Sequence, residues 1–548
     1  MASIRQKCET RLKGMQSIRL DYEPDWKDIA RFAMPARSRF LNSDTNKNRR
    51  QRNGKLMDEH GIASYRTLAN GMTSGLSSPS RPWLRLATYD DAQMDEQDVK
   101  IWLSEVERRI GAFMAQTNFY GAAKTGYHEL GLFGTEAVVM QEHPEYGMVC
   151  HALTAGEYWT AMGDGMVPDT LYRRCPMSIR QAVQSFGNAV SKQVMNAYDR
   201  SCYDDVVDVF HAIEPDSNWK PGDPFSKQYS SVYWDEKDDK DRTLRVSGYH
   251  DKPFWCARWD TTGSDVYGYS PGMEGLASLR ELQLQVKRRN EAIDHLVKPE
   301  KIVPPGLRLT GQPGNIVSAS QVDKDSVLVP YQMPYQAVQA IELSIERLER
   351  KIDATSYAEL FMAITNMQGI QPRNMEEIAS RNEEKLTQLG PTIERVNNGK
   401  LEVAVDRVFG IMLRGNMLPE PPEALQNAEI KIEFISILTQ MQRMVGLGQI
   451  ERTVSFIGNL AGASPDALDK LNIDEMIDEY AERAGTPQRV IRSTGDATKL
   501  RNERARQANM AKMAEMMPAV QQGADAARLL SETDVNGQPM LDTLLGAG

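Results

Sequence analysis

The sequence predicts a mainly helical α+β protein, and three patterns along its 548 residues support this class. Two stretches, 271–297 and 335–356, repeat apolar residues at three- and four-residue steps, the spacing of one helix face. Residues 132–260 instead alternate short apolar runs with turns, as strands do. Helical spacing returns in 374–416 and in the Ala- and Met-rich tail 464–548. We therefore expect a mixed body from which long helices extend.

The body is expected to cover residues 1–270 as one α+β domain. Helical spacing covers 4–33, 56–76 and 95–130, and a basic segment at 37–55 suits an exposed loop. The predicted strands are 137–140, 158–161, 206–213, 231–234 and 244–249.

The stretches 271–297 and 335–356 would form helices roughly 40 Å and 30 Å long. Their apolar stripe is too narrow to enclose a core, so each helix should pack on the other and then on neighbouring copies of the chain. The sequence thus predicts an oligomer. The subunit-packing candidates are Leu279, Leu282, Val286 and Ile293 on the first helix, and Ile341, Ile345 and Leu348 on the second.

Between these helices, the insert 298–334 combines several prolines with β-type runs. Proline removes backbone donors and confines strands to edges, which predicts a small rigid module with exposed strand edges. A hairpin without any partner is the alternative.

Residues 357–463 should contain a loop, a long helix and a strand. Gly369 and Pro372 interrupt helical spacing between 361 and 374, and a short strand pattern covers 430–434. The helix 374–416 ends near Gly415.

Composition excludes several classes. No window approaches eighteen apolar residues, so we expect no membrane span. The five cysteines are widely separated, which favours reduced thiols in a cytosolic setting. A formal net charge of −10 argues against a protein that coats nucleic acid by neutralising phosphates.

Motifs for catalysis are incomplete. Residues 121–125 end in Lys-Thr, but Asn118 and Ala123 stand where a phosphate-binding loop needs glycines. Residues 127–130 lack the second His of a zinc-protease helix, and the acidic run 235–241 lacks the glycine of a calcium loop. We therefore predict no enzyme, no metal site and no cofactor.

Four strings, in order along the chain, resemble segments of the portal, or head-to-tail connector, proteins of short-tailed double-stranded DNA bacteriophages (podoviruses). They are LMDEHGIASYRTLANGMTSGLSSPSRPW at 56–83, LGLFGTEAVV at 130–139, YGYSPGMEGLASL at 267–279 and IKIEFISILTQMQR at 430–443. The order of predicted parts also matches that family.

The resemblance implies a portal fold, with these parts in order: a wing (1–270), a stem helix (271–297), a clip (298–334), a returning stem helix (335–356), a wing helix with channel loop and strand (357–463), and a crown with a helical tail (464–548). It implies a ring, usually of twelve subunits, at one capsid vertex of the virion, assembled in the host bacterial cytoplasm. Double-stranded DNA would pass through the ring during packaging and ejection. The implied protein partners are the terminase large subunit and tail adaptor proteins at the clip, and major capsid and scaffolding proteins at the wing.

The resemblance also suggests residue roles. Lys287, Arg288 and Arg289, with Lys298 and Lys301, could form basic rings in the channel. A solvated helix face, or pairing with Glu281 and Glu291, is the alternative. Met367 and Arg373 would lie at a constriction formed by the channel loop, although a plain connecting loop fits the sequence too. The candidates for motor and tail docking are Pro304, Pro305, Arg308 and Asn315.

Two other functions remain open from sequence alone. One is a virion scaffold or tail-tube component that never meets the motor. The other is a DNA-packaging enzyme, against which the missing phosphate loop argues.

Overall fold

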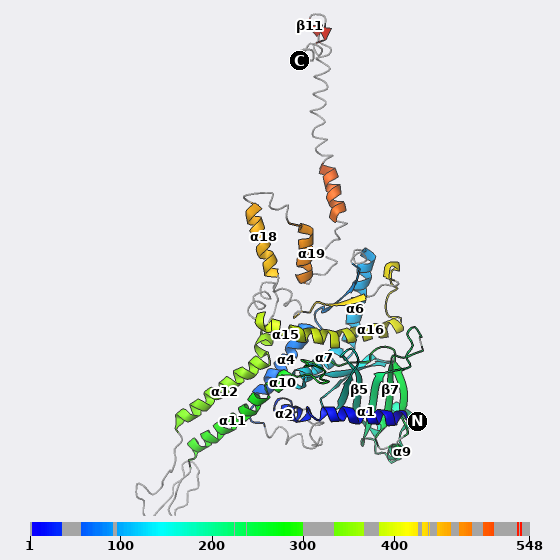
Figure 1. Ribbon diagram of the computed structural model, residues 1–548, viewed down its shortest axis with the longest axis vertical. Helices are drawn as coiled ribbons and strands as arrows, with labels where there is room; N and C mark the ends of the chain where they lie inside the picture. The colour runs from blue at the N-terminus through cyan, green and yellow to red at the C-terminus, as the bar shows by residue number, and fades with distance from the viewer. Residues whose placement is uncertain are drawn as a thin grey trace, which may run out of the picture. The chain divides into compact units, whose positions relative to one another are not determined.

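The structure is a computed structural model (Figure 1). It describes residues 3–35, 56–90, 96–299, 334–365, 383–425, 430–436, 438, 447–461, 471–484, 497–508, 534–535 and 538–539, except for positions 224, 237 and 240. The chain divides into two compact units, one formed by Met1–Asp90 with Trp102–Glu451 and the other by Asp91–Ile101 with Arg452–Gly548. Within the described ranges, none of the helices has both the length and the apolar content that crossing a bilayer requires.

Helices and strands are mixed, so the predicted α+β class is confirmed at that level. The main helices are α1 Ile4–Arg19, α2 Glu23–Ala33, α4 His60–Leu76, α6 Gln97–Gln116, α7 Phe119–Phe133, α8 Ile179–Phe186, α9 Lys192–Asp199, α10 Pro271–Glu274, α11 Leu276–Val297, α12 Tyr335–Thr355, α13 Ala358–Thr365, α15 Glu383–Val396, α16 Val403–Arg414, α18 Leu447–Ala461 and α19 Ile473–Ala484. The strands of the larger unit are β1 Leu84–Thr88, β2 Ala137–His143, β3 Gly147–Leu153, β4 Tyr158–Met162, β5 Pro168–Ser178, β6 Val206–Pro215, β7 Tyr229–Asp235, β8 Arg245–Tyr249, β9 Phe254–Trp255 and β10 Ile430–Phe434.

Two predicted helices are interrupted. The stretch 271–297 forms α10 and α11 with Gly275 between them, where a Cβ atom would lie 2.4 Å from the hydroxyl oxygen of Tyr65. The stretch 383–414 forms α15 and α16 with a π-helical turn at Asn397–Glu402. Neither break changes the spacing of apolar residues along the sequence. Crowding by Tyr65 at the first break and a π turn at the second could therefore not be predicted from the sequence.

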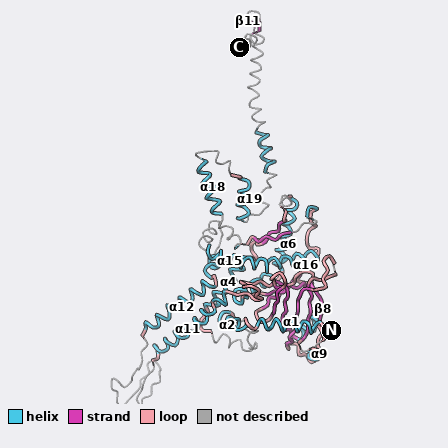
Figure 2. Tube along the Cα trace, viewed as in Figure 1, coloured by secondary structure: helices cyan, strands magenta, loops and turns pink. Residues whose placement is uncertain are grey.

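The strands form three antiparallel sheets in the larger unit (Figure 2). Five strands follow the order β4-β5-β6-β7-β8, and three follow the order β3-β2-β9. The third sheet pairs β1 with β10, with Leu84 opposite Phe434. It joins segments that are far apart in the sequence. The strand at 430–434 was predicted from its local pattern, whereas β1 was not predicted.

Helix α1 lies against the five-stranded sheet through an apolar face. Cys8, Leu12 and Met15 pack in one buried cluster with Trp159 and Trp234. Three arginines of α1 fix its position by bonds to distant segments. Arg5 donates to the carbonyl oxygens of Glu236, Asp239 and Arg242. Arg11 pairs with Glu214. Arg19 donates to the carbonyl oxygens of Gly156 and Tyr158.

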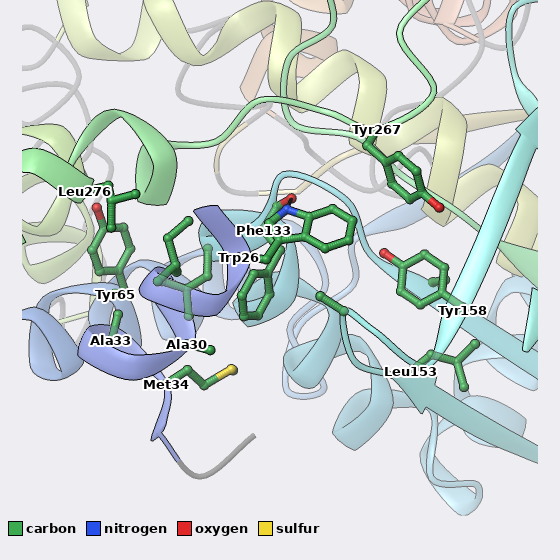
Figure 3. Packing of buried hydrophobic residues seen from close by; sticks show 14 of the residues in the cluster. Trp26, Ala30, Ala33, Met34, Tyr65, Phe133, Leu153, Tyr158, Tyr267 and Leu276 are labelled. Carbon is green, nitrogen blue, oxygen red and sulfur yellow. Dashed lines mark hydrogen bonds between the residues drawn. The ribbon is translucent and has the colours of Figure 1, made fainter. Parts of the chain in front are cut away.

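A second core connects the sheets with α2, α4, α7 and α11 (Figure 3). Trp26 is at its centre, where its indole nitrogen donates to the carbonyl oxygen of Phe133 over 3.1 Å. The ring of Tyr267 meets Trp26 edge-on, with centroids 5.1 Å apart. The same core continues into the two long helices through Leu276, and this continuity determines how those helices are held.

Candidate functional site

Helices α11 and α12 form an antiparallel hairpin that extends from the core (Figure 1). They contain 22 and 21 residues, so each is about 30 Å long. The seam between them is apolar and buried, and it runs into the core around Trp26.

Most of the predicted subunit-packing residues are in this seam. Leu279, Leu282, Val286, Ile345 and Leu348 are each at most 8% exposed within a single chain. This corrects the expectation that their stripe needs neighbouring copies, because α2 and α4 supply the missing partner surface at the hairpin base.

Ile293 differs from those five, since it is 39% exposed, and Ile341 is half-buried at the edge of the core. For these two residues, packing between subunits stays a prediction.

Two exposed leucines were missed from the sequence. Leu284 on α11 is 46% exposed and Leu343 on α12 is 55% exposed. Each lies two residues from seam residues on its own helix, which places it about 200° around the helix axis from the seam. The sequence did contain a signal for them: each is a leucine that stands among the polar residues of an amphipathic helix, on the face opposite its apolar stripe.

The basic candidates on α11 differ in their surroundings. Lys287 is exposed and pairs with Glu291 over 3.7 Å, which is the alternative raised for it from the sequence. Arg288 and Lys298 are exposed, whereas Arg289 is half-buried and donates to the side chain of Asn290 over 3.4 Å.

Several sequence candidates lie outside the described residues. They are Lys301, Met367, Arg373, Pro304, Pro305, Arg308 and Asn315, together with nearly all of the insert 298–334, residues 366–374 of the predicted channel loop and the basic segment 37–55.

The base of the hairpin is anchored by a buried glutamine. Gln283 accepts hydrogen bonds from the backbone N–H groups of Met57 and Asp58 over 2.7 and 3.0 Å. Its amide nitrogen donates to the carbonyl oxygen of Asp58 over 2.8 Å. One side chain therefore fixes the segment that leads into α4.

Helix α4 grips the other side of the base. His60 lies 3.0 Å from the carboxylate of Asp353, and the hydroxyl groups of Ser64 and Ser356 are hydrogen-bonded. The hydroxyl of Tyr65 donates to the carbonyl oxygen of Pro271 over 2.8 Å. Helix α4 is thus tied to α12 and to α10, the short helix that leads into α11.

Replacing Gln283 with alanine should lower the free energy of unfolding by about 1–2 kcal/mol, because three partly buried hydrogen bonds to the backbone of Met57 and Asp58 are lost. Chemical denaturation of the purified protein measures this change. Gln339→Ala, at an exposed position of α12, is the matched control and should change stability by less than about 0.5 kcal/mol. Equal effects of the two substitutions would contradict the anchoring role.

Helix α13 turns off the end of α12 and returns along α4. Tyr357 makes the turn with a φ of 56°, in the left-handed region. Phe361 is fully buried against α4, where a Cβ atom on Gly71 would lie 2.2 Å from its side chain. Only glycine permits this approach. Residues 361–365 of α13 fall within the stretch 361–374 that was predicted to form the channel loop, so the helix extends further than predicted.

The larger unit also contains a buried ion pair. The ammonium group of Lys400 lies 3.0 Å from both carboxylate oxygens of Glu136, and both side chains are fully buried. It also donates to the carbonyl oxygen of Ala123 and lies 3.2 Å from the ring centroid of Tyr127. Burial lowers the pKa of Lys400 to about 8 and raises the pKa of Glu136, while their mutual attraction opposes both shifts. The pair joins the π turn to α7 and to the residue directly before β2.

In the described part of the chain, no group of three or more His, Cys, Asp or Glu side chains is arranged to hold a metal ion.

A family model described as bacteriophage head to tail connecting protein matches residues 5–491. The chain belongs to this family. Among curated relatives of the connector, the portal protein of Salmonella phage epsilon15 is 36% identical over 545 residues, which cover 98% of this chain and 97% of the relative. The probable portal protein of Bordetella phage BPP-1 is 33% identical over 537 residues, with 96% and 95% covered. The predicted resemblance and portal function are therefore confirmed.

Among solved structures, a chain from the virion of a native gene transfer agent particle aligns with this connector at 11% identity and a TM-score of 0.35. The alignment covers 77% of this chain and 89% of the other, and a TM-score at this level does not establish a shared fold.

Proposed function

We propose that this connector works as a ring of identical subunits at one capsid vertex, with a central channel for double-stranded DNA. The match to portal proteins over nearly the whole chain carries this proposal. The exposed leucines on the hairpin support it, because a monomer gains nothing from keeping them in water. Negative-stain electron microscopy of the purified protein should show rings with a central hole.

We propose the part boundaries and the ring size as the resemblance implies them: wing 1–270, stem helices 271–297 and 335–356, clip 298–334, wing helix with channel loop and strand 357–463, and crown with tail 464–548, in twelve copies. In this scheme the hairpin α11–α12 is the stem. Its rigid anchorage by Gln283 and α4 suits a part that must keep its direction in a ring.

The proposed partners follow from the same scheme. The clip, with Pro304, Pro305, Arg308 and Asn315, would bind the terminase large subunit and later the tail adaptor proteins, and the wing would meet the major capsid and scaffolding proteins. Assembly would occur in the host bacterial cytoplasm. The family is a structural one, and we propose no catalytic role for the chain.

Two lysines are the best candidates for the channel surface. Lys287 and Lys298 are both exposed, and Lys298 directly follows the last residue of α11, about three helical turns nearer the tip of the hairpin than Lys287. With a formal net charge of −10 per chain, such rings would guide DNA without neutralising enough phosphates to hold it.

Replacing Lys287 and Lys298 together with alanine should leave rings intact but change the amount of DNA that particles package or retain, by about twofold or more. Packaging efficiency and genome retention are measured in particles assembled with the variant. Lys192→Ala with Lys220→Ala removes the same charge from exposed wing positions and should have no effect. Unchanged packaging and retention would show that these lysines do not line the DNA channel.

A further inference from the structure

We propose that neighbouring copies of this chain contact each other through the outer sides of α11 and α12, the sides that face away from the hairpin's own seam. This inference rests on the ring proposed above and identifies the residues that join its subunits. One copy would present the outer side of α11, and the next copy would present the outer side of α12.

The outer side of α11 contains Glu281, Leu284 and Arg288, which are all exposed. Arg288 lies two residues after Val286 of the seam, and the three residues follow one another at steps of three and four. They therefore form one continuous strip about half a turn from the seam.

The matching strip on α12 contains Leu343, Glu346 and Arg350. Leu343 lies two residues before Ile345 and Arg350 two residues after Leu348, so both point away from the seam. Glu346 lies beside them, and its carboxylate pairs with Arg350 over 3.2 Å. The side chains of Glu346 and Arg350 are 56% and 75% exposed, which leaves both accessible to a second partner.

The two strips are complementary at matching heights. Both helices end at the tip of the hairpin, α11 with Val297 and α12 with Tyr335. Glu281 and Arg350 lie about 15 residues from these ends, and Arg288 and Glu346 lie about 10 residues from them. Rotation about a ring axis keeps every residue at its height. In a neighbouring pair, Glu281 would therefore face Arg350 and Arg288 would face Glu346. Leu284 would be buried between these two charge pairs, and Leu343 just beyond the second pair, on its tip side.

Two charge-exchanged variants test this contact. The first carries Glu281→Lys with Arg288→Glu, and the second carries Glu346→Lys with Arg350→Glu. Both variants keep the net charge of the chain, and the second keeps an opposite-charge pair within α12. Neither alters a seam residue. In either variant alone, like charges meet at every subunit contact, so the fraction of chains in rings should fall at least about tenfold.

Mixing the two variants in equal amounts should restore rings. In an alternating ring with an even number of subunits, the altered α11 of the first variant meets the altered α12 of the second, and the remaining contacts are wild type. Rings that form only in the mixture would show that these residues meet between chains. If the charged residues met within one chain instead, like charges would still face each other in every variant chain, and mixing would restore nothing. Analytical ultracentrifugation and negative-stain microscopy give the ring fraction, and circular dichroism confirms that each variant folds.

The wild-type chain and a control variant separate the outcomes. Lys192→Glu with Asp199→Lys exchanges two exposed charges on α9, keeps the net charge and should assemble like the wild type. Rings formed by either hairpin variant alone would overturn the proposed contact while leaving the ring itself intact. Folded variants that fail to assemble both separately and together would overturn it too. A wild-type chain that forms no rings would overturn the ring and the contact together.

Discussion

Lys400→Ala should lower the free energy of unfolding by about 3–5 kcal/mol, because it leaves the buried carboxyl group of Glu136 without its partner. That carboxyl group must then lose its charge or remain unpaired among apolar side chains, and both outcomes destabilise the folded state. Thermal and chemical denaturation of the purified chain measure the change.

Two comparison variants show whether burial is the cause. Lys400→Met combined with Glu136→Gln removes both charges and should recover more than half of the lost stability. Lys431→Ala breaks a partly exposed ion pair with Glu433 and should cost less than about 1 kcal/mol. If Lys400→Ala were as mild as Lys431→Ala, the buried pair would not contribute to stability in the way its geometry indicates.

Phe361→Ala should lower the free energy of unfolding by about 3–5 kcal/mol, since the phenyl ring is fully buried and its loss leaves a cavity between α13 and α4. Gly71→Ala should cost about 1–3 kcal/mol by overpacking, because the new methyl group would overlap the same ring. Phe361→Ala removes the ring atoms that this methyl group would overlap but keeps the Cβ of residue 361, which would still lie 2.3 Å away, so the cost of the double variant should stay close to the sum of the two. Denaturant titration of all four chains measures the coupling.

Gly14→Ala is the matched control for the glycine substitution. Gly14 also lies within a helix, but no atom lies within 4 Å of the position its Cβ would take. Alanine there should stabilise the chain by about 0.5–1 kcal/mol through helix propensity. Gly71→Ala with an equal stabilising effect would show that α13 does not depend on close contact with α4.

Local patterns predicted many of the separate elements of this fold. The apolar steps at Leu279, Leu282 and Val286 predicted α11 and its partner, and short apolar runs predicted four strands of the five-stranded sheet, β4, β6, β7 and β8, but not β5. The break between α10 and α11 could not be predicted in this way. A Cβ atom at Gly275 would collide with the hydroxyl of Tyr65, which comes from a distant part of the sequence.

Long-range partners were not predictable from one sequence. The pairing of Leu84 with Phe434, the ion pair of Lys400 with Glu136 and the grip of Gln283 on Asp58 all join segments that are distant along the chain. A narrow stripe on a helix indicates that another surface must cover it, but not whether that surface belongs to the same chain. In the structure, most of the stripe is covered by residues of the same chain. The proposed subunit contact therefore involves the exposed residues Leu284 and Leu343 instead.

The position of α1 sets an order for folding during synthesis. Leu12 and Met15 leave the ribosome early, but the aromatic surface that covers them is complete only after Trp234 has been made. Until then, the helix exposes an apolar face to solvent, and contacts between distant segments form slowly. A nascent chain of this connector is therefore expected to need protection at its amino terminus for as long as the sheet is unfinished.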